Sequence, residues 1–416
     1  MIHPKNLSIK EYTYDLTDDR IAKYPLSERD ASKLLIYESG KIIHDHYRNL
    51  DHFLPAESLL IFNDTKVIEA RILFQKPTGG IIEIFCLEPH EQYHDIAMAM
   101  SERKQVLWQC LIGGASKWKH GQILKKKLKT IKREVVLTAQ YVEKRADSFV
   151  IAFSWDDHDL SFAEILHQAG AIPLPPYLKR EAEISDTERY QTIFAHHAGS
   201  VASPTAGLHF TESLLKKLEA KNIKTNVVTL HVGAGTFKPV KTDTLEHHEM
   251  HPEFITISRE TIENISSNLS RNIIPVGTTS LRTIESMYWL GVKLLTANDH
   301  RPNDRHKFIE LAQWEAYELE ENNVAPQEAF SAVLGFLDKR NMKRLLARTQ
   351  LLIAPSYKVK IANGLITNFH QPQSTLLLLV AALIGEDWKS VYNFALANDF
   401  RFLSYGDGCL LWFNRI

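Results

Sequence analysis

Short apolar segments separated by turn residues dominate the first third of the chain. Residues 33–37 (KLLIY) and 58–62 (SLLIF) are apolar and bounded by polar positions, a pattern typical of buried strands. From residue 70 to about 153, short alternating segments follow one another with turn signals between them and no convincing helical pattern: ARILFQK, IIEIFCLEP, VLWQCLIGG, QILKKKLK, REVVLTAQYVE and DSFVIAFSW. Such a series predicts a small antiparallel barrel or sandwich.

Helical spacing of apolar positions begins after residue 160. Helices are predicted near residues 160–170, 211–221 and 258–270, and strands at 227–232 (VVTLHV) and 273–279 (IIPVGTT). This alternation predicts βαβ units, and hence a parallel or mixed sheet covered by helices. The run STLLLLVAALI at 374–384 is too short to span a bilayer and predicts a core helix.

We therefore predict an α/β fold with a discontinuous organisation. Residues 1–69 and 154–416 form a mixed-sheet α/β body, and residues 70–153 form an inserted small antiparallel β-barrel domain. Residues 296–348 begin with a polar, turn-rich stretch and continue with amphipathic patterns, which predicts an additional helical insertion within the body.

Composition narrows the class of protein. The 416 residues are 44% hydrophobic and 24% charged, which excludes a disordered or collagen-like chain. The formal net charge is −1, so a polyanionic partner must be met by a local patch. Cys86, Cys110 and Cys409 form no CxxC pair and indicate reduced thiols. The first residues lack the pattern of a signal peptide, so we expect a cytoplasmic protein without membrane association.

Three segments carry small or hydroxyl-bearing residues beside predicted strands or helix starts. Residues 199–211 (GSVASPTAGLHFT) combine small residues with a following helix start suited to a carboxylate or phosphate, or simply form a loop with Thr211 as N-cap. Residues 229–240 (TLHVGAGTFKPV) hold a glycine-rich turn that lacks the third glycine of a dinucleotide motif. Residues 276–286 (VGTTSLRTIES) suit the polar end of a nucleoside or amino acid, or form a capped helix with an exposed Arg282–Glu285 pair.

Two further segments suggest other functions. In residues 246–253 (EHHEMHPE), His247 and His251 would share one helix face near Glu253, and His231 could complete a site for a metal-dependent hydrolase. Six cations between residues 125 and 133 could neutralise RNA phosphates, which leaves a non-catalytic RNA-binding module as an alternative, or they could protect an edge strand: Lys125, Lys126, Lys127, Lys129, Lys132 and Arg133.

Taken together, the motifs resemble the S-adenosylmethionine:tRNA ribosyltransferase-isomerase family of queuosine biosynthesis. The resemblance runs from residue 14 to residue 408, through YDLTDDRIAKYPLSERDASKLL, IFNDTKVIEARI, TGGIIEI, PLPPYLKR, ERYQTIFAHHAGSVASPTAGLHFT, TLHVGAGTFKPV, HHEMHPE, VGTTSLRTIES, LITNFHQPQSTLLLLV and FRFLSYGDG. Ser203 stands where the family usually has alanine, and residues 90–104 and 296–348 have no counterpart in shorter relatives.

The resemblance implies an α/β body with a smaller β-barrel and a reaction that consumes S-adenosylmethionine. Its ribosyl part would be transferred to 7-aminomethyl-7-deazaguanine at the wobble position of a tRNA with a GUN anticodon and rearranged, giving epoxyqueuosine, adenine and methionine. The resemblance implies no metal, and we expect no obligate protein partner.

This chemistry needs a base, a donor for the departing purine and a site for the methionine carboxylate. On the positions that the resemblance supplies, we expect His209 and His231 in proton transfer, with Asp64, Glu83 and Asp407 as orienting or amine-binding carboxylates. The expected cofactor-binding residues are Ser203, Thr205, Gly207, Gly233, Gly235, Thr236, Thr278, Thr279 and Arg282. The expected contacts to the deazaguanine or the anticodon are Arg71, Arg189, Tyr190, Gln191, Phe210 and His370.

Overall fold

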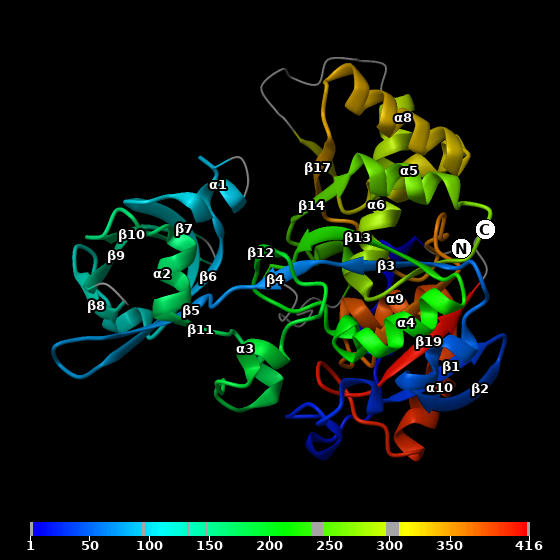
Figure 1. Ribbon diagram of the computed structural model, residues 1–416, viewed down its shortest axis with the longest axis horizontal. Coiled ribbons are helices and arrows are strands. Elements are labelled where there is room, and N and C mark those ends of the chain that lie inside the picture. The colour runs from blue at the N-terminus through cyan, green and yellow to red at the C-terminus, as the bar shows by residue number, and fades with distance from the viewer. Residues whose placement is uncertain are drawn as a thin grey trace.

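The structure is a computed structural model that describes residues 3–93, 96–130, 133–145, 148–233, 244–296 and 308–413. In these ranges the strands form sheets of seven, six, four and two strands. Helices pack on the six-stranded and four-stranded sheets, which are mixed (Figure 1). Figure 1 shows the seven-stranded sheet on the left, set apart from a larger body that holds both termini.

A six-stranded mixed sheet runs through the larger body. Its neighbouring strands are, in order, β15 (Ile273–Pro275), β3 (Leu59–Asn63), β13 (Lys224–His231), β14 (Glu253–Ser258), β17 (Arg344–Thr349) and β16 (Ile309–Leu311). β3 is parallel to both β15 and β13, and β14 is antiparallel to both β13 and β17. All five residues of β3 are buried, as expected for a strand covered on both faces.

A four-stranded sheet packs beside it, and a short parallel pair links the body to the remaining sheet. The four strands are, in order, β18 (Gly364–Asn368), β19 (Gly408–Trp412), β1 (Lys33–Glu38) and β2 (Lys41–His46), and the pair is β12 (His197–Ser200) with β4 (Thr65–Val67). An isolated parallel bridge between Val276 and Ile366 joins the end of β15 to β18. The two mixed sheets therefore meet next to the start of the helix that follows β15.

The seven-stranded sheet is antiparallel and curled. Its order is β11 (Gly170–Ala171), β5 (Arg71–Gln75), β6 (Ile81–Pro89), β7 (Gln105–Gly113), β10 (Phe149–Trp155), β9 (Glu134–Lys144) and β8 (Ile123–Lys129). Alternate residues of each strand face an apolar interior, as in β7, where Val106, Trp108 and Cys110 are buried. The edges approach each other, because Lys126 of β8 donates from Nζ to the carbonyl of Leu73 in β5 at 3.1 Å.

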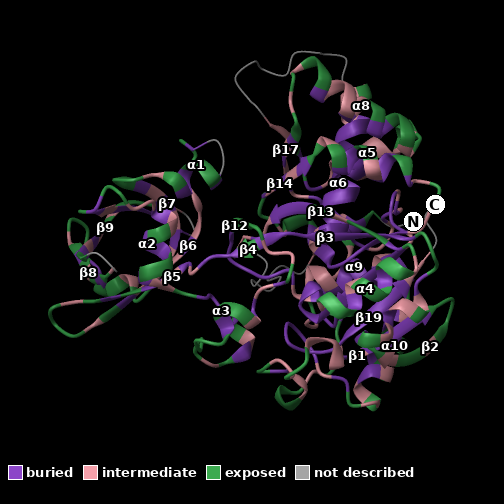
Figure 2. Ribbon diagram, in the orientation of Figure 1, coloured by how far each residue is buried: buried purple, intermediate pink, exposed green. Residues whose placement is uncertain are grey.

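The helices cover the sheets of the body and close the interior of the curled sheet. Their bounds are α1 (Ile96–Ser101), α2 (Phe162–Ala169), α3 (Asp186–Arg189), α4 (Glu212–Ala220), α5 (Arg259–Ser267), α6 (Thr278–Thr296), α7 (Glu315–Leu319), α8 (Pro326–Lys339), α9 (Thr375–Ile384) and α10 (Asp387–Ala397). α6 is buried along most of its length (Figure 2). A Cβ on Gly291 of α6 would lie 2.2 Å from the Ala329 carbonyl oxygen of α8, so this close helix crossing requires glycine.

The predicted fold class is confirmed as a mixed α/β protein with several sheets, one of them a curled antiparallel half-barrel. The six predicted strands of that region are present, and the apolar run at 374–384 forms the buried helix α9. Three expectations are wrong. The described part of residues 296–348, predicted as a helical insertion, holds α7 and α8 but also β16 and most of β17, which are strands of the six-stranded sheet. The sequence pattern missed the short helix α1, and residues 246–253 do not form a helix but a 3₁₀ turn at Leu245–His247, a loop and the start of β14. The domain boundaries remain a prediction.

Candidate active site

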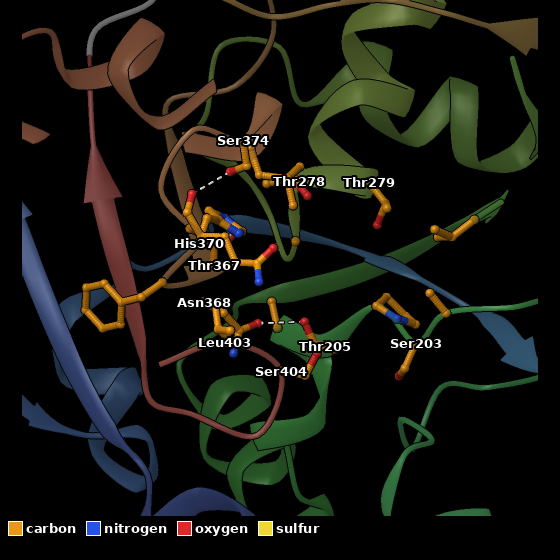
Figure 3. Close-up of a pocket in the computed structure, with 18 of the residues that line it drawn as sticks. Ser203, Thr205, Thr278, Thr279, Thr367, Asn368, His370, Ser374, Leu403 and Ser404 are labelled. Atoms are coloured by element: carbon orange, nitrogen blue, oxygen red, sulfur yellow. Dashed lines mark hydrogen bonds between the residues drawn. The ribbon is translucent and has the colours of Figure 1, made fainter. Parts of the chain in front are cut away.

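A cleft lies where the carboxyl end of β18 meets the first turns of α6 and α9 (Figure 3). Its lining in the described ranges consists mainly of hydroxyl, amide and apolar side chains, with no Asp, Glu, Lys or Arg among them. These residues are Tyr177, Tyr190, Ala202, Ser203, Pro204, Thr205, Ala206, Val232, Gly277, Thr278, Thr279, Thr367, Asn368, Phe369, His370, Gln371, Ser374, Leu376, Leu403 and Ser404. Recognition by these side chains must therefore come from hydrogen bonds rather than from ion pairs.

The backbone around Gly277 brings the start of α6 into the cleft. Gly277 donates its N–H to the Ile366 carbonyl of β18 at 2.7 Å and has a φ of +93°, a conformation that favours glycine. The chain can therefore turn sharply from β15 into α6. At the start of α9, the Ser374 hydroxyl accepts a hydrogen bond from the Leu377 N–H at 3.2 Å, which caps that helix.

Two helix N-termini thus face one end of the cleft. Figure 3 shows Thr278 of α6 and Ser374, the cap of α9, at the same end, above His370 and Thr367. Each helix N-terminus presents unpaired N–H groups and the equivalent of about half a positive charge. This end of the cleft therefore favours a carboxylate or phosphate group over a cation.

His370 lies in the wall of the cleft with restricted chemistry. Its Nε2 lies 3.0 Å from the Thr367 hydroxyl, and its main-chain N–H donates to the Tyr392 hydroxyl at 3.1 Å. Burial lowers the pKa of His370 to about 3. The imidazole is therefore neutral at pH 7 and can serve as a hydrogen-bonding group, as a predicted substrate-binding residue would.

A connected set of side chains occupies the other end of the cleft. The Thr205 hydroxyl donates to Asn368 Oδ1 at 2.9 Å (Figure 3), and Asn368 Nδ2 lies 3.3 Å from His209 Nε2. Thr205 and Asn368 line the cleft, whereas His209 is only 3% exposed and lies behind them. Burial lowers the pKa of His209 to about 3.

Among the described residues, Ser203 and Tyr190 carry the buried hydroxyls of the lining that have no hydrogen-bond partner. Ser203 is 7% exposed as a residue, and its hydroxyl is buried without a partner in the part of the chain that the structure describes. Leaving a buried hydroxyl unpaired costs about 1–3 kcal/mol. The Ser203 hydroxyl is therefore available to a bound ligand.

Asp64 and His231 lie next to the cleft, at the ends of β3 and β13. The buried Asp64 carboxylate accepts from the Thr229 hydroxyl at 2.7 Å and lies 3.0 Å from Nδ1 of the exposed His197. Nδ1 of His231 lies 3.1 Å from the Thr65 hydroxyl. His231 directly precedes Val232, which lines the cleft, but neither His231 nor Asp64 is itself among the lining residues.

The structure brings some predicted residues together in the cleft and leaves others elsewhere. Ser203, Thr205, Tyr190, Thr278, Thr279 and His370 line it. Glu83 and Arg71 pair with each other at 3.1 Å on the curled sheet. Asp407 accepts from the main-chain N–H groups of Lys33 and Arg401 at 3.0 and 2.8 Å, so it holds the turn that carries Ser404.

Arg282 points away from the cleft into the body. Its Nη1 lies 2.6 Å from Glu253 Oε2, and both side chains are buried. Glu285 has separate partners, since it accepts from the Tyr357 hydroxyl at 2.8 Å and from the Ile361 N–H at 2.8 Å. The alternative of an exposed Arg282–Glu285 pair is therefore wrong, because α6 is buried where the sequence pattern suggested one exposed face.

The remaining predicted residues support the backbone around the cleft. Arg189 donates to the carbonyls of Leu26 and Ser27, and Gln191 holds both main-chain groups of Val67. Phe210 packs edge-on against Phe62 in the core. A Cβ on Gly207 would lie 2.9 Å from Thr192, whereas a Cβ on Gly233 would meet no atom of the described residues within 4 Å. Gly235 and Thr236 lie outside the described residues.

The histidines proposed for a metal site are not brought together. Among the residues that the structure describes, no group of three or more His, Cys, Asp and Glu side chains could hold a metal ion. His247 and His251 are exposed, and Glu253 pairs with Arg282. This geometry gives no support to the metal-dependent hydrolase.

Several lining residues were not among the predicted site residues: Tyr177, Asn368, Gln371, Ser374 and Ser404. The polar segments 367–375 and 404–407 were the available signal, because each places polar groups beside a turn at the edge of an apolar run. Single residues of this kind are more often structural, so only their convergence in space identifies them.

The fold and the cleft define a class of protein: an α/β protein with a hydrogen-bonding ligand site at the carboxyl end of a strand, flanked by helix N-termini. Residues 9–411 match the family model described as queuosine biosynthesis protein. The chain is 34% identical over 409 residues to a protein of Trichlorobacter lovleyi named S-adenosylmethionine:tRNA ribosyltransferase-isomerase, covering 97% of this chain and 99% of the relative. A protein of Chlorobaculum parvum with the same name is 34% identical over 410 residues, covering 97% of this chain and 100% of the relative.

This chain belongs to the S-adenosylmethionine:tRNA ribosyltransferase-isomerase family of queuosine biosynthesis, and the predicted resemblance and enzyme class are confirmed. A crystal structure of the S-adenosylmethionine tRNA ribosyltransferase of Thermotoga maritima matches with 24% identity and a TM-score of 0.45, covering 96% of this chain and 99% of that one. Within the described ranges, every helix is too short or too polar to cross a membrane.

Proposed function

We propose that this enzyme transfers the ribosyl part of S-adenosylmethionine to 7-aminomethyl-7-deazaguanine at the wobble position of tRNA and isomerises it. The products are epoxyqueuosine in tRNA, adenine and methionine. The observation that carries the proposal is the cleft with two converging helix N-termini and a hydroxyl-rich lining, in a chain of this family. The proposed tRNA is one with a GUN anticodon, and the proposed compartment is the cytoplasm.

The cleft offers binding groups for the carboxylate and the purine of S-adenosylmethionine. The N-termini of α6 and α9 suit the methionine carboxylate, with Thr278 and Thr279 as hydroxyl donors, whereas the Ser374 hydroxyl donates to the Gln371 carbonyl at 2.7 Å. The amide of Gln371 and the neutral imidazole of His370 can hydrogen-bond the purine, which leaves as adenine. The Ser203 hydroxyl supplies one further unpaired group.

The reaction begins with removal of a proton beside the sulfonium, and a positioned base contributes about 10²–10⁴-fold to such a step. We assign this proton transfer to His231, which lies at the end of β13 beside the cleft and is oriented by the Thr65 hydroxyl at 3.1 Å. Asp64, which holds Thr229 and His197 nearby, supports the same strand ends. No residue in this assignment requires a metal.

Adenine release tests the proposal directly. Purified enzyme is incubated with S-adenosylmethionine and tRNA carrying 7-aminomethyl-7-deazaguanine, and adenine is quantified by chromatography. We expect adenine only when both substrates are present, and none with tRNA that carries guanine at the wobble position. Binding of tRNA that never responds to S-adenosylmethionine would instead support the RNA-binding module.

Thr205→Val tests whether the reaction uses this cleft. The substitution removes a hydroxyl from the lining, so we expect kcat/KM for adenine release to fall at least about tenfold, the effect of about 1.4 kcal/mol. Thr225→Val is the matched control, because Thr225 is exposed on β13 and outside the lining. Equal activity of both variants would place the reaction elsewhere.

A further inference from the structure

Three side chains form a hydrogen-bonded path from the core to the surface of the cleft. His209 ends the 3₁₀ turn Thr205–His209, Thr205 begins it, and Asn368 ends β18. Asn368 lies between the other two, with Nδ2 3.3 Å from His209 Nε2 and Oδ1 2.9 Å from the Thr205 hydroxyl. Only Thr205 and Asn368 reach the cleft.

His209 is held in one protonation and tautomeric state by its surroundings. Its ring stacks on Tyr47, with centroids 4.2 Å apart and planes inclined by 18°. Accepting the Asn368 N–H requires a lone pair on Nε2, so the imidazole is neutral with its proton on Nδ1. Burial, together with the positive charges of Arg401 and Arg29, favours the same neutral state.

This state leaves His209 without a free basic nitrogen, because Nε2 accepts from Asn368 and Nδ1 carries the proton, and Asn368 and Thr205 stand between the ring and the cleft. It also fixes the Asn368 amide, whose N–H side must face His209 and whose oxygen must face Thr205. The Thr205 hydroxyl has then donated its proton, so it offers only lone pairs to the cleft. Asn368 keeps a second N–H as a donor.

An acceptor and a donor side by side match a ribose hydroxyl, which both donates and accepts, and they also match the N6–H and N7 edge of adenine. Because the adenine is assigned above to Gln371 and His370, the ribose hydroxyl is the group left for Asn368 and Thr205. We propose that His209 is a positioning residue, which orients Asn368 so that Asn368 and Thr205 together bind a ribose hydroxyl of S-adenosylmethionine. This inference rests on the proposed function for the identity of the ligand.

The test compares binding of S-adenosylmethionine with binding of its 2′-deoxy and 3′-deoxy analogues by calorimetry. The wild-type enzyme should bind one of the two analogues about tenfold more weakly than S-adenosylmethionine. His209→Gln retains an acceptor for Asn368 and should keep this ratio. His209→Phe keeps a ring to stack on Tyr47 but has no acceptor, so its ratio should fall below about threefold.

Thr205→Val provides a second route to the same answer without altering the core. It removes the acceptor from the cleft and should also abolish the discrimination, even if His209→Phe does not fold. The inference is overturned if Thr205→Val or His209→Phe keeps the wild-type ratio of analogue affinities. It is also overturned if His209→Gln loses this ratio as fully as His209→Phe does.

Kinetics separate positioning from base catalysis and from failure of the proposed function. If His209 were the base, His209→Gln and His209→Phe would lose kcat equally, by about 10²-fold or more, with unchanged binding ratios. That result would overturn the positioning role. If the wild-type enzyme released no adenine but discriminated between the deoxy analogues, the result would contradict the proposed reaction. It would still support a hydroxyl-binding site at Asn368 and Thr205.

Discussion

Arg282→Met tests whether Arg282 is a structural residue or a ligand-binding one. Arg282 was expected to bind the cofactor, but its guanidinium pairs with Glu253 at 2.6 Å and donates to the Leu351 carbonyl at 3.2 Å, away from the cleft lining. At 2.6 Å and an effective dielectric constant of about 20, the attraction between the two charges is about 6 kcal/mol, most of which offsets their desolvation.

Removing one partner leaves the other charge buried and uncompensated, which costs about 3–5 kcal/mol. We therefore expect Arg282→Met to lower the free energy of unfolding of the body by that amount. The double variant with Glu253→Gln should cost less than the sum of the single variants, with a coupling energy of about 1.5–3 kcal/mol. Arg259→Met is the matched control, because its ion pair with Asp338 is exposed and contributes less than about 1 kcal/mol.

Urea unfolding followed by tryptophan fluorescence measures these differences, and the buried Trp289 reports from two turns further along the same helix. Calorimetry then gives the affinity of the folded Arg282→Met protein for S-adenosylmethionine, which we expect to remain within about threefold of wild type. A variant with unchanged unfolding and abolished binding would refute the reasoning and restore Arg282 to the cofactor site.

Three further predictions concern the cleft, its buried histidines and the lysine-rich strand. Ser203→Ala should weaken binding of S-adenosylmethionine about 3–10-fold without loss of stability, because the hydroxyl has no partner among the described residues. Equal dissociation constants would show that the ligand does not use it. The pKa of His209 is lowered from 6.5 to about 3 in the folded state, so below pH 6.5 the unfolded chain binds a proton that the folded protein does not. The free energy of unfolding should therefore be highest above pH 6.5 and about 2 kcal/mol lower at pH 5. His209→Gln should flatten this dependence in urea titrations, and a slope equal to that of wild type would contradict the assignment. The double variant Lys125→Gln, Lys129→Gln should reduce the salt dependence of tRNA binding if β8 contacts phosphates. Lys41→Gln, at an exposed position of β2, is the control and should leave the salt dependence unchanged. An unchanged salt dependence in the double variant would show that β8 is a protected edge strand.

Periodicity sufficed for most of the elements. Strands such as Leu59–Asn63 and helices such as Thr375–Ile384 are local patterns of apolar residues, and the sequence contains the whole of such a pattern. α1 was missed because its six residues are too few to establish a helical period. Residues 246–253 were expected to be helical and are not. Regular histidine spacing does not by itself supply the apolar stripe that a helix buries.

The site was harder to predict because it depends on direction and depth. Thr205 and Thr278 were expected in the cleft and line it, as hydroxyls beside helix starts often do. Arg282 lies one turn further along α6 on the same side as Thr278, but Glu253 holds its guanidinium outside the cleft lining, which no spacing could reveal while the helix is buried all round. Asn368 could be recognised only after β18 was placed between the turn at Thr205–His209 and the start of α6.

The pairing of β11 with β5 has a consequence for the order of folding. Residues 170 and 171 pair with residues 72 and 71, and a Cβ on Gly170 would lie 1.8 Å from the Glu69 carbonyl oxygen, so the chain leaves and re-enters the body at adjoining points. If the curled sheet forms first, its ends are already together when the body assembles. The body then closes a connection of a few residues instead of about 100, which lowers the entropic cost of closure by about 3 kcal/mol. If the curled sheet folds first, a variant with a disrupted β11–β5 pair should refold more slowly than wild type. Its unfolding rate should be unchanged.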